Sequence, residues 1–333
     1  INALNVFPVP DGDTASNMIL TLQAAIDAAA GGGSLTEVAD AMARGALRGA
    51  RGNSGTIVSQ FFHGLNLGLR GLESAGPVEM ARAFTSAASA AYAAVHEPKE
   101  GTILTVGRRW AQAAINEAER GGDLVAVFER ALRGAEEALE ETPALLDVLG
   151  EAGVVDAGGE GMVVALRGAL AVLRGDVVEE EVAHGHGVSN SPRFGESGPW
   201  MDDAHHREAI HLADIEFAYC TEFLVQGESL SVDALREALM PLGDSLIVVG
   251  DHRLVKVHLH TNRPGRALEV ACDAGELLSV NVGNMKQQNR EHVSAKRSGV
   301  NESANGNAGP DVAVVAVAAG KGFEELFRSL GVA

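Results

Sequence analysis

The chain has 333 residues, of which 46% are hydrophobic and 21% charged, and its formal net charge is −19. This length predicts two or three domains. The acidic balance argues against a nucleic-acid surface but leaves a phosphate ligand open, since an acidic site can hold phosphate through a bound cation. With two cysteines there is no disulfide framework, which favours the reducing cytoplasm. No segment has the pattern of a signal peptide or of an integral membrane span.

Residues 1–174 are expected to form one all-α domain. Small and apolar residues recur at helical spacing, as in "TLQAAIDAAA" at 21–30 and "LVAVFERALRGAEEALEE" at 124–141. The breaks between these segments carry glycine, proline and serine. The high content of alanine and glycine indicates helices that approach one another closely.

The rest of the chain divides into shorter parts. Residues 175–208 have no periodicity and read as a linker, and residues 286–310 read as a second polar linker. Between them, residues 209–285 give the order β-α-β-β-α-β of a ferredoxin-like α+β sandwich, with a hairpin around Gly250–Asp251–His252. Residues 311–333 give one β-α unit, the expected start of a third domain. We therefore expect a fragment truncated at both ends.

The segment "VPDGDT" places two carboxylates, Asp11 and Asp13, around Gly12. Glycine allows a turn tight enough for both carboxylates to reach one ion. Mg²⁺ is commonly bound by one or two carboxylates together with substrate phosphates. The alternative is a plain turn in which Asp13 or Thr14 caps the next helix. That alternative explains one aspartate and leaves the second without a role.

Three further helix starts carry polar residues and glycine. In "RGNSG" at 51–55, Asn53 and Ser54 could hold a phosphate at a helix N-terminus, or Ser54 could be an ordinary N-cap. Thr102 opens another helix, and Asp156 stands two residues before Gly158 at a third. Together with the aspartate pair, these starts suggest a site at one end of the helical domain.

A second constellation is expected on the sheet of residues 209–285. Successive strand residues point to opposite faces, so Lys256, His258 and His260 share one face and the alternate valines and leucine share the other. In a ferredoxin-like order the first and third strands are neighbours, which brings Cys220 onto the open face beside the two histidines. A thiolate and two imidazoles suit Zn²⁺. The alternative is a solvated sheet face, and Cys272 is expected in the core.

Several of these motifs resemble one family. "NALNVFPVPDGDTASNM", "RGNSG", "EGTILTV" and "VVDAGGEGM" are similar to the nucleotide-binding domain shared by dihydroxyacetone kinases and bacterial fatty-acid kinases. "YCTEFLV", "VKVHLHT" and "NVGNMKQQ" resemble the middle domain of the fatty-acid kinase ATP-binding subunit. The resemblance covers essentially the whole chain and implies an antiparallel helical barrel with ATP at one end.

The resemblance also implies roles for individual residues. Asp11 and Asp13 match the catalytic, Mg²⁺-binding aspartates, and Asn5 lies near where related kinases place a further aspartate. The positions implied to bind the nucleotide are those of the helix starts: Thr14, Asn17, Asn53, Ser54, Gly55, Thr102, Asp156 and Gly158. The residues characteristic of the middle domain are Cys220, His258 and His260, here expected to bind Zn²⁺.

The function expected from this resemblance is ATP-dependent phosphorylation of a fatty acid carboxylate to an acyl phosphate. The sequence shows no evident hydrophobic pocket for an acyl chain. This agrees with a fatty acid that is presented by a separate lipid-binding carrier protein. The alternatives are a dihydroxyacetone-type (glycerone) kinase and a non-catalytic nucleotide-binding regulator. The sequence is also compatible with a homodimer.

Overall fold

The computed structural model describes residues 1–176 and 215–290. Most of the two expected linkers and the whole expected third domain, residues 311–333, lie outside the described residues. The described residues comprise a helical part, 1–176, and a sheet-containing part, 215–290.

The first described segment is helical, as the periodicity predicts. After a short 3-10 helix, η1 (Asn2–Leu4), it contains α1 (Thr14–Ala29), α2 (Leu35–Gly49), α3 (Gly52–Leu69), α4 (Pro77–Ala94), α5 (Ile103–Glu119), α6 (Leu124–Leu145), α7 (Asp147–Ala152) and α8 (Ala157–Arg174). The mostly helical character of residues 1–174 is confirmed, whereas the closed antiparallel barrel stays a prediction.

Small residues let these helices pack closely around a few aromatic rings. Phe84 makes edge contacts with Trp110 and Phe128, at centroid distances of 5.7 and 5.1 Å. Fully buried alanines of α4, α5 and α6 fill the space around them. In α3, Gly64 has no room for a side chain, because a Cβ there would lie 2.3 Å from the carbonyl oxygen of Ser86 in α4.

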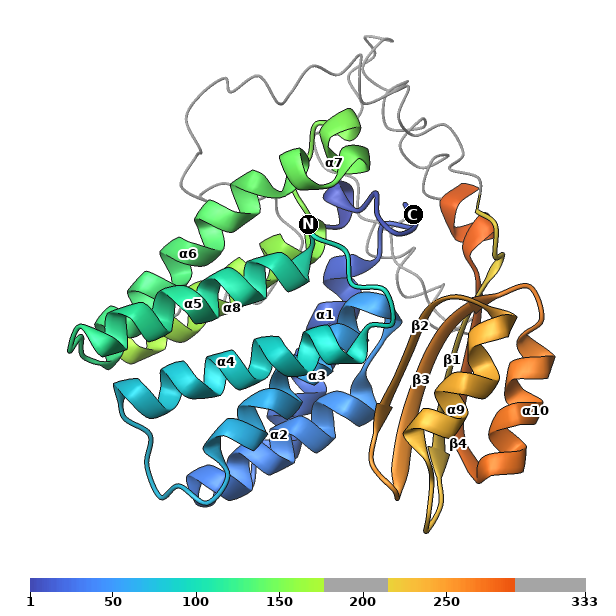
Figure 1. Cartoon of the computed structure of the whole chain (residues 1–333), viewed down its shortest axis with the longest axis horizontal. Helices are drawn as coiled ribbons and strands as arrows, with labels where there is room; N and C mark the ends of the chain where they lie inside the picture. Colours follow the sequence, from blue (N-terminus) through green and yellow to red (C-terminus); the bar gives the residue numbers. More distant parts are fainter. Residues whose placement is uncertain (177–214, 291–333) are drawn as a thin grey trace, which may run out of the picture. The chain divides into compact units, whose positions relative to one another are not determined.

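The second described segment has the predicted order β-α-β-β-α-β. Its elements are β1 (Tyr219–Gln226), α9 (Val232–Leu239), η3 (Met240–Leu242), β2 (Gly243–Gly250), β3 (Leu254–Thr261), α10 (Pro264–Ala274) and β4 (Glu276–Asn284). The strands lie in the order β2-β3-β1-β4, and every neighbouring pair is antiparallel. The expected adjacency of the first and third strands is confirmed, and α9 and α10 lie over one face of the sheet (Figure 1).

The two faces of the sheet have different neighbours. Phe223, Val257 and Leu259 are fully buried in a cluster with residues of α9 and α10. On the other face, Ile247 and Val249 of β2 belong to the helical core cluster. The expectation that this second face is open was wrong. Alternation separates the two faces of a strand, but it does not show what covers the more polar one.

Two side-chain hydrogen bonds join the sheet-containing part to loops of the helical part. The Lys256 ammonium donates to the carbonyl oxygen of Ala50 at 3.1 Å, and the Asn289 amide donates to the carbonyl oxygen of Pro10 at 2.9 Å. Lys256 and Asn289 are both 2% exposed. These contacts attach the polar face of the sheet to the loop before α3, and the segment after β4 to the loop before α1.

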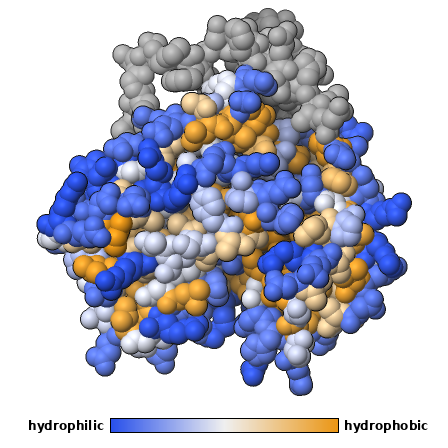
Figure 2. Space-filling view, in the orientation of Figure 1, coloured by the Kyte–Doolittle hydropathy of each residue, from blue (hydrophilic) through white to orange (hydrophobic). Residues whose placement is uncertain are grey.

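In Figure 2 hydrophilic residues cover much of the visible face, with apolar patches scattered among them. Cys272 is exposed on α10, so its expected place in the core was wrong. In residues 1–176 and 215–290 no helix combines the length and apolar character needed to cross a membrane.

Glycine substitutions test the close packing of α3 on α4. We expect Gly64→Ala to lower the free energy of unfolding by about 1–3 kcal/mol, because the added methyl group overlaps the α4 backbone. Gly168→Ala is the matched control, since a Cβ at this exposed α8 position meets nothing within 4 Å. The control should gain up to about 1 kcal/mol from helix propensity. Urea unfolding measures both, and equal effects would contradict the packing described.

Candidate functional site

A cavity of about 90 Å³ lies between the loops of the helical part and the polar face of the sheet. The helical part contributes Asn5, Asp11 and Asp13, then Thr14 and Asn17 of α1, and the turn 51–54 before and at the start of α3. The sheet contributes Cys220, Glu222, His258 and His260. The acidic pair and the Cys/His group, which the sequence presents as two separate constellations, thus line one cavity.

The two aspartates form the acidic side of the cavity. Gly12 between them has φ +72°, a left-handed conformation suited to glycine. The Asn5 side-chain amide donates to Asp11 Oδ1 at 2.6 Å, so Asn5 holds an aspartate through a hydrogen bond. Burial, and then the negative charge of Asp13, raise the pKa of Asp11 to about 7. A divalent cation at this pair would relieve that repulsion.

The alternative role of Asp13 as a helix cap finds no support. Asp13 stands at the N-cap position of α1, but its side chain makes no capping hydrogen bond. Instead, Asn2 Oδ1 accepts the backbone N–H of Ala15 at 2.6 Å. The helix start is therefore held by Asn2, and the carboxylate of Asp13 faces the cavity.

The turn before α3 presents an uncapped helix N-terminus to the same cavity. Arg51 is the N-cap, and no side chain of the described residues caps the helix there. Ser54 lies within the first turn, so the alternative of Ser54 as N-cap was wrong. Gly52 has φ +60°, and a Cβ on it would lie 2.3 Å from Asn17 Nδ2. Backbone N–H groups at such a start can bind phosphate oxygens.

Gly55 has a different place from its neighbours. It is buried one residue beyond the lining of the cavity. A Cβ on it would lie 2.4 Å from Thr21 Oγ1, so the glycine lets α3 approach α1. Its contribution in the structure is to bring the two helix starts together.

Thr102, Asp156 and Gly158 do not line this cavity. Thr102 Oγ1 accepts the N–H of Leu104 at 3.4 Å, and Asp156 Oδ2 accepts that of Gly159 at 2.7 Å, so both cap their own helices. A Cβ on Gly158 would lie 3.2 Å from Cβ of Ile103, which packs the start of α8 against the start of α5. Burial raises the pKa of Asp156 to about 6. Their expected nucleotide-binding roles stay predictions.

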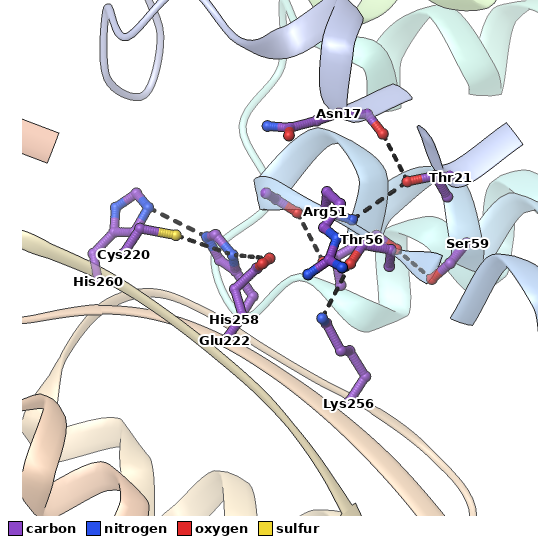
Figure 3. A network of polar contacts seen from close by, with 12 residues as sticks. Asn17, Thr21, Arg51, Thr56, Ser59, Cys220, Glu222, Lys256, His258 and His260 are labelled. Atoms are coloured by element: carbon purple, nitrogen blue, oxygen red, sulfur yellow. Dashed lines mark hydrogen bonds and ion pairs between the residues drawn. The ribbon is translucent and has the colours of Figure 1, made fainter. Parts of the chain in front are cut away.

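The Cys/His group lies on paired positions of β1 and β3. Cys220 is opposite His260, and Glu222 is opposite His258. One ligand atom from each of Cys220, His258 and His260 lies within 4.8 Å of the others. Figure 3 shows these side chains pointing from the sheet toward one another.

The two imidazole rings are inclined at 63° to each other, and each directs its Nδ1 toward a carboxylate. Their Nε2 atoms are 3.2 Å apart, whereas His258 Nδ1 faces Glu222 Oε1 at 3.2 Å and His260 Nδ1 faces Asp244 Oδ1 at 3.5 Å. A carboxylate at Nδ1 favours the tautomer whose Nε2 lone pair is available to a metal. Two nitrogens bound to one tetrahedral zinc lie about 3.3 Å apart, given zinc–nitrogen distances of about 2.0–2.1 Å. The spacing of the two Nε2 atoms therefore fits zinc, while Cys220 Sγ lies 3.8 Å from His258 Nδ1.

The third member of the group, Cys220, is held neutral in the absence of a cation. Burial raises its pKa well above the usual value, and the negative charges of Glu222, Asp11 and Asp13 raise it further. A bound zinc ion would favour the thiolate and release the proton. Three protein ligands would leave a fourth zinc position for water or another ligand.

The sequence patterns assigned no role in a site to Arg51, Glu222 or Lys256, although these residues line or adjoin the cavity. Arg51 stands in the quoted "RGNSG", and its exposed side chain lines the cavity. Glu222 and Lys256 belong to the same strand faces as the Cys/His group, so alternation was the available signal. The sequence did not reveal that their face is buried, and burial lowers the pKa of Lys256.

Two family comparisons agree with this architecture. Residues 8–171 match the DAK2 domain, which covers the helical part, and the chain belongs to the DAK2 family. Residues 216–292 match the FakA-like middle domain of fatty acid kinases. The chain thus combines a DAK2 domain with a FakA-like middle domain, the domain pair of this family.

Three similar curated proteins come from staphylococci. A protein of Staphylococcus saprophyticus is 37% identical over 99% of this chain and 60% of its own length. Relatives of S. epidermidis and S. aureus are 36% and 35% identical, again over 99% of this chain, and over 60% and 59% of their own lengths. All three are described as uncharacterised. The chain spans about 60% of the length of these relatives.

The raised pKa of Asp11 predicts how stability depends on pH. Between the ordinary value of 3.8 and about 7, the folded protein keeps a proton that the unfolded chain loses. The free energy of unfolding of the metal-free protein should therefore fall as pH rises through this window. Asp11→Asn should lack this contribution. Its free energy of unfolding, taken relative to that of wild type, should therefore increase from pH 4.5 to pH 7.5. Urea unfolding at both pH values measures the difference, and parallel pH profiles would refute the assignment.

Proposed function

We propose that this chain is the ATP-binding, catalytic part of a kinase that phosphorylates a fatty acid carboxylate to an acyl phosphate. The observation that carries the proposal is the single cavity where Asp11 and Asp13 face the uncapped start of α3. Kinases need a bound cation and amide donors around the transferred phosphoryl group. The DAK2 and fatty acid kinase-like matches support the same class of reaction.

The chain's own residues would position ATP rather than react with it. Asp11 and Asp13 would hold Mg²⁺, with Asn5 fixing the orientation of Asp11 through its hydrogen bond. The amides at the start of α3, with Asn53 and Ser54, would bind phosphate oxygens, and Thr14 and Asn17 would complete that side. Bound Mg²⁺ would supply neutralisation of the phosphate charge. Arg51, which lines the cavity, could add a cation beside the phosphoryl group.

A carboxylate acceptor agrees with the groups present. A fatty acid is already ionised at neutral pH, so its attack on phosphorus needs no general base. Cys220, His258 and His260, the proposed zinc ligands, line the same cavity as the acidic pair. We propose that zinc held there belongs to the same site as the nucleotide, with a separate lipid-binding protein presenting the acyl chain.

Variants of the aspartate pair test the kinase assignment. We expect Asp11→Ala and Asp13→Ala to lower ATP turnover at least about 100-fold, because each loses a ligand of the charge-neutralising cation. Asp27→Ala, an exposed position of α1, is the matched control and should keep its activity. Circular dichroism should show the helices intact in all three. Full turnover in both cavity variants would exclude the proposed Mg²⁺ site.

The same assay can identify the acceptor. Acyl phosphate should form with oleate plus a fatty acid-binding protein and not with dihydroxyacetone. Turnover with dihydroxyacetone alone would favour a glycerone-type kinase. Nucleotide binding without turnover on either acceptor would favour a regulator, and in both cases the fatty acid assignment fails.

Metal content tests the zinc assignment separately. We expect about one zinc per chain in the purified protein, with loss of at least half of it in His258→Ala because one of three ligands is removed. His252→Ala, in the exposed β2–β3 turn, serves as control and should retain its zinc. Elemental analysis decides the question, and equal metal content in wild type and His258→Ala would rule the site out.

A further inference from the structure

Lys256 carries a charge in a place where most proteins put an apolar side chain. It lies on β3 between Leu224 of β1 and Val249 of β2, on the face that carries the Cys/His group. Only 2% of the residue is exposed. Within residues 1–176 and 215–290, its ammonium makes one hydrogen bond, to the carbonyl oxygen of Ala50 at 3.1 Å.

This arrangement is costly for stability alone. Taking an ammonium out of water carries a large desolvation penalty, and an apolar side chain of similar volume often does equally well or better. Glu222 lies close enough for its negative charge to offset part of the penalty, whereas the nearby Arg51 adds to it. What the ammonium provides, and an apolar group cannot, is a directed hydrogen bond to the backbone of Ala50.

Ala50 is the residue that links α2 to the turn before α3. It is the C-cap of α2, and Arg51, which follows it, is the N-cap of α3. From the α1 side, the turn is held by the Arg51 N–H, which donates to Thr21 Oγ1 at 3.3 Å. From the sheet side it is held by Lys256. Figure 3 shows Lys256 reaching from its strand toward this turn, with Thr21 beyond it.

We propose that Lys256 is a positioning residue that fixes the turn 50–54, so that the uncapped start of α3 faces the aspartate pair. This inference rests on the proposed function only in taking that helix start as the phosphate-binding element. Lys256 itself does not line the cavity, so it acts through the backbone of its neighbours. It joins the sheet face that carries the Cys/His group to the turn that carries the phosphate-binding amides.

The test uses Lys256→Met in the whole 333-residue chain, since methionine keeps most of the stem and removes the ammonium. We expect faster amide hydrogen exchange in peptides that cover residues 50–56. We also expect affinity for a Mg²⁺-bound non-hydrolysable ATP analogue to fall about tenfold, measured by calorimetry. Zinc content and the melting temperature should change little. A purely structural role would instead lower the melting temperature and leave the turn and the affinity unaltered.

Two further variants make the test specific. Arg253→Met, in the exposed turn just before β3, removes a nearby cation and should match wild type in exchange and affinity. Lys256→Arg keeps the positive charge and should recover part of the affinity. If the methionine variant does not fold, Lys256→Gln takes its place, because its side chain is uncharged and one bond shorter than that of lysine, and exchange at 50–56 is compared with wild type.

The outcomes separate this inference from the proposed function. Unchanged exchange at 50–56 in folded Lys256→Met overturns the positioning role, and so does unchanged affinity of this variant when wild type binds the analogue. If wild type does not bind the analogue, the kinase proposal fails, while the exchange measurement still decides whether Lys256 holds the turn.

Discussion

The burial of a polar sheet face is the constraint on which the rest of this structure depends. Glu222, Lys256 and His258 are each no more than 2% exposed, although their side chains are polar or charged. Such groups are tolerated only where every one of them finds a partner. Glu222 and His258 satisfy each other, and Lys256 requires an acceptor from outside the sheet. The face can therefore be covered only by a segment that offers a free carbonyl group, which the end of α2 provides.

The same burial gives the cavity its chemical character. Asp11 and Cys220 have raised pKa values, and His258 has a lowered one, in each case with burial as the largest cause. All three shifts favour the uncharged form when no cation is present. Cation binding would reverse that preference for the aspartate and the thiol, with release of protons. Electrostatically, the site is thus suited to exchanging protons for metal ions.

The sequence allowed the elements to be predicted better than their surroundings. The period of two in "VKVHLHT" fixed which side chains share a face with Cys220, because strand geometry leaves no other choice. It did not reveal that Ile247 and Val249, on the same face of the sheet, pack within the core of the helical part. At helix starts, threonine and aspartate suit capping and ligand binding equally. Only the observed hydrogen bonds distinguish Thr102, which caps its helix, from Asp13, which does not.

The contacts that complete the cavity join segments far apart along the chain. Lys256 and Ala50 are separated by 206 residues, and Asn289 and Pro10 by 279. Local helical contacts form early in folding, whereas closures of this length come late. During synthesis from the N-terminus, the aspartate loop would therefore exist long before the strands that wall it in. One side of the site is available to solvent and ions until β4 and Asn289 have been synthesised, so assembly of the site is coupled to completion of the sheet.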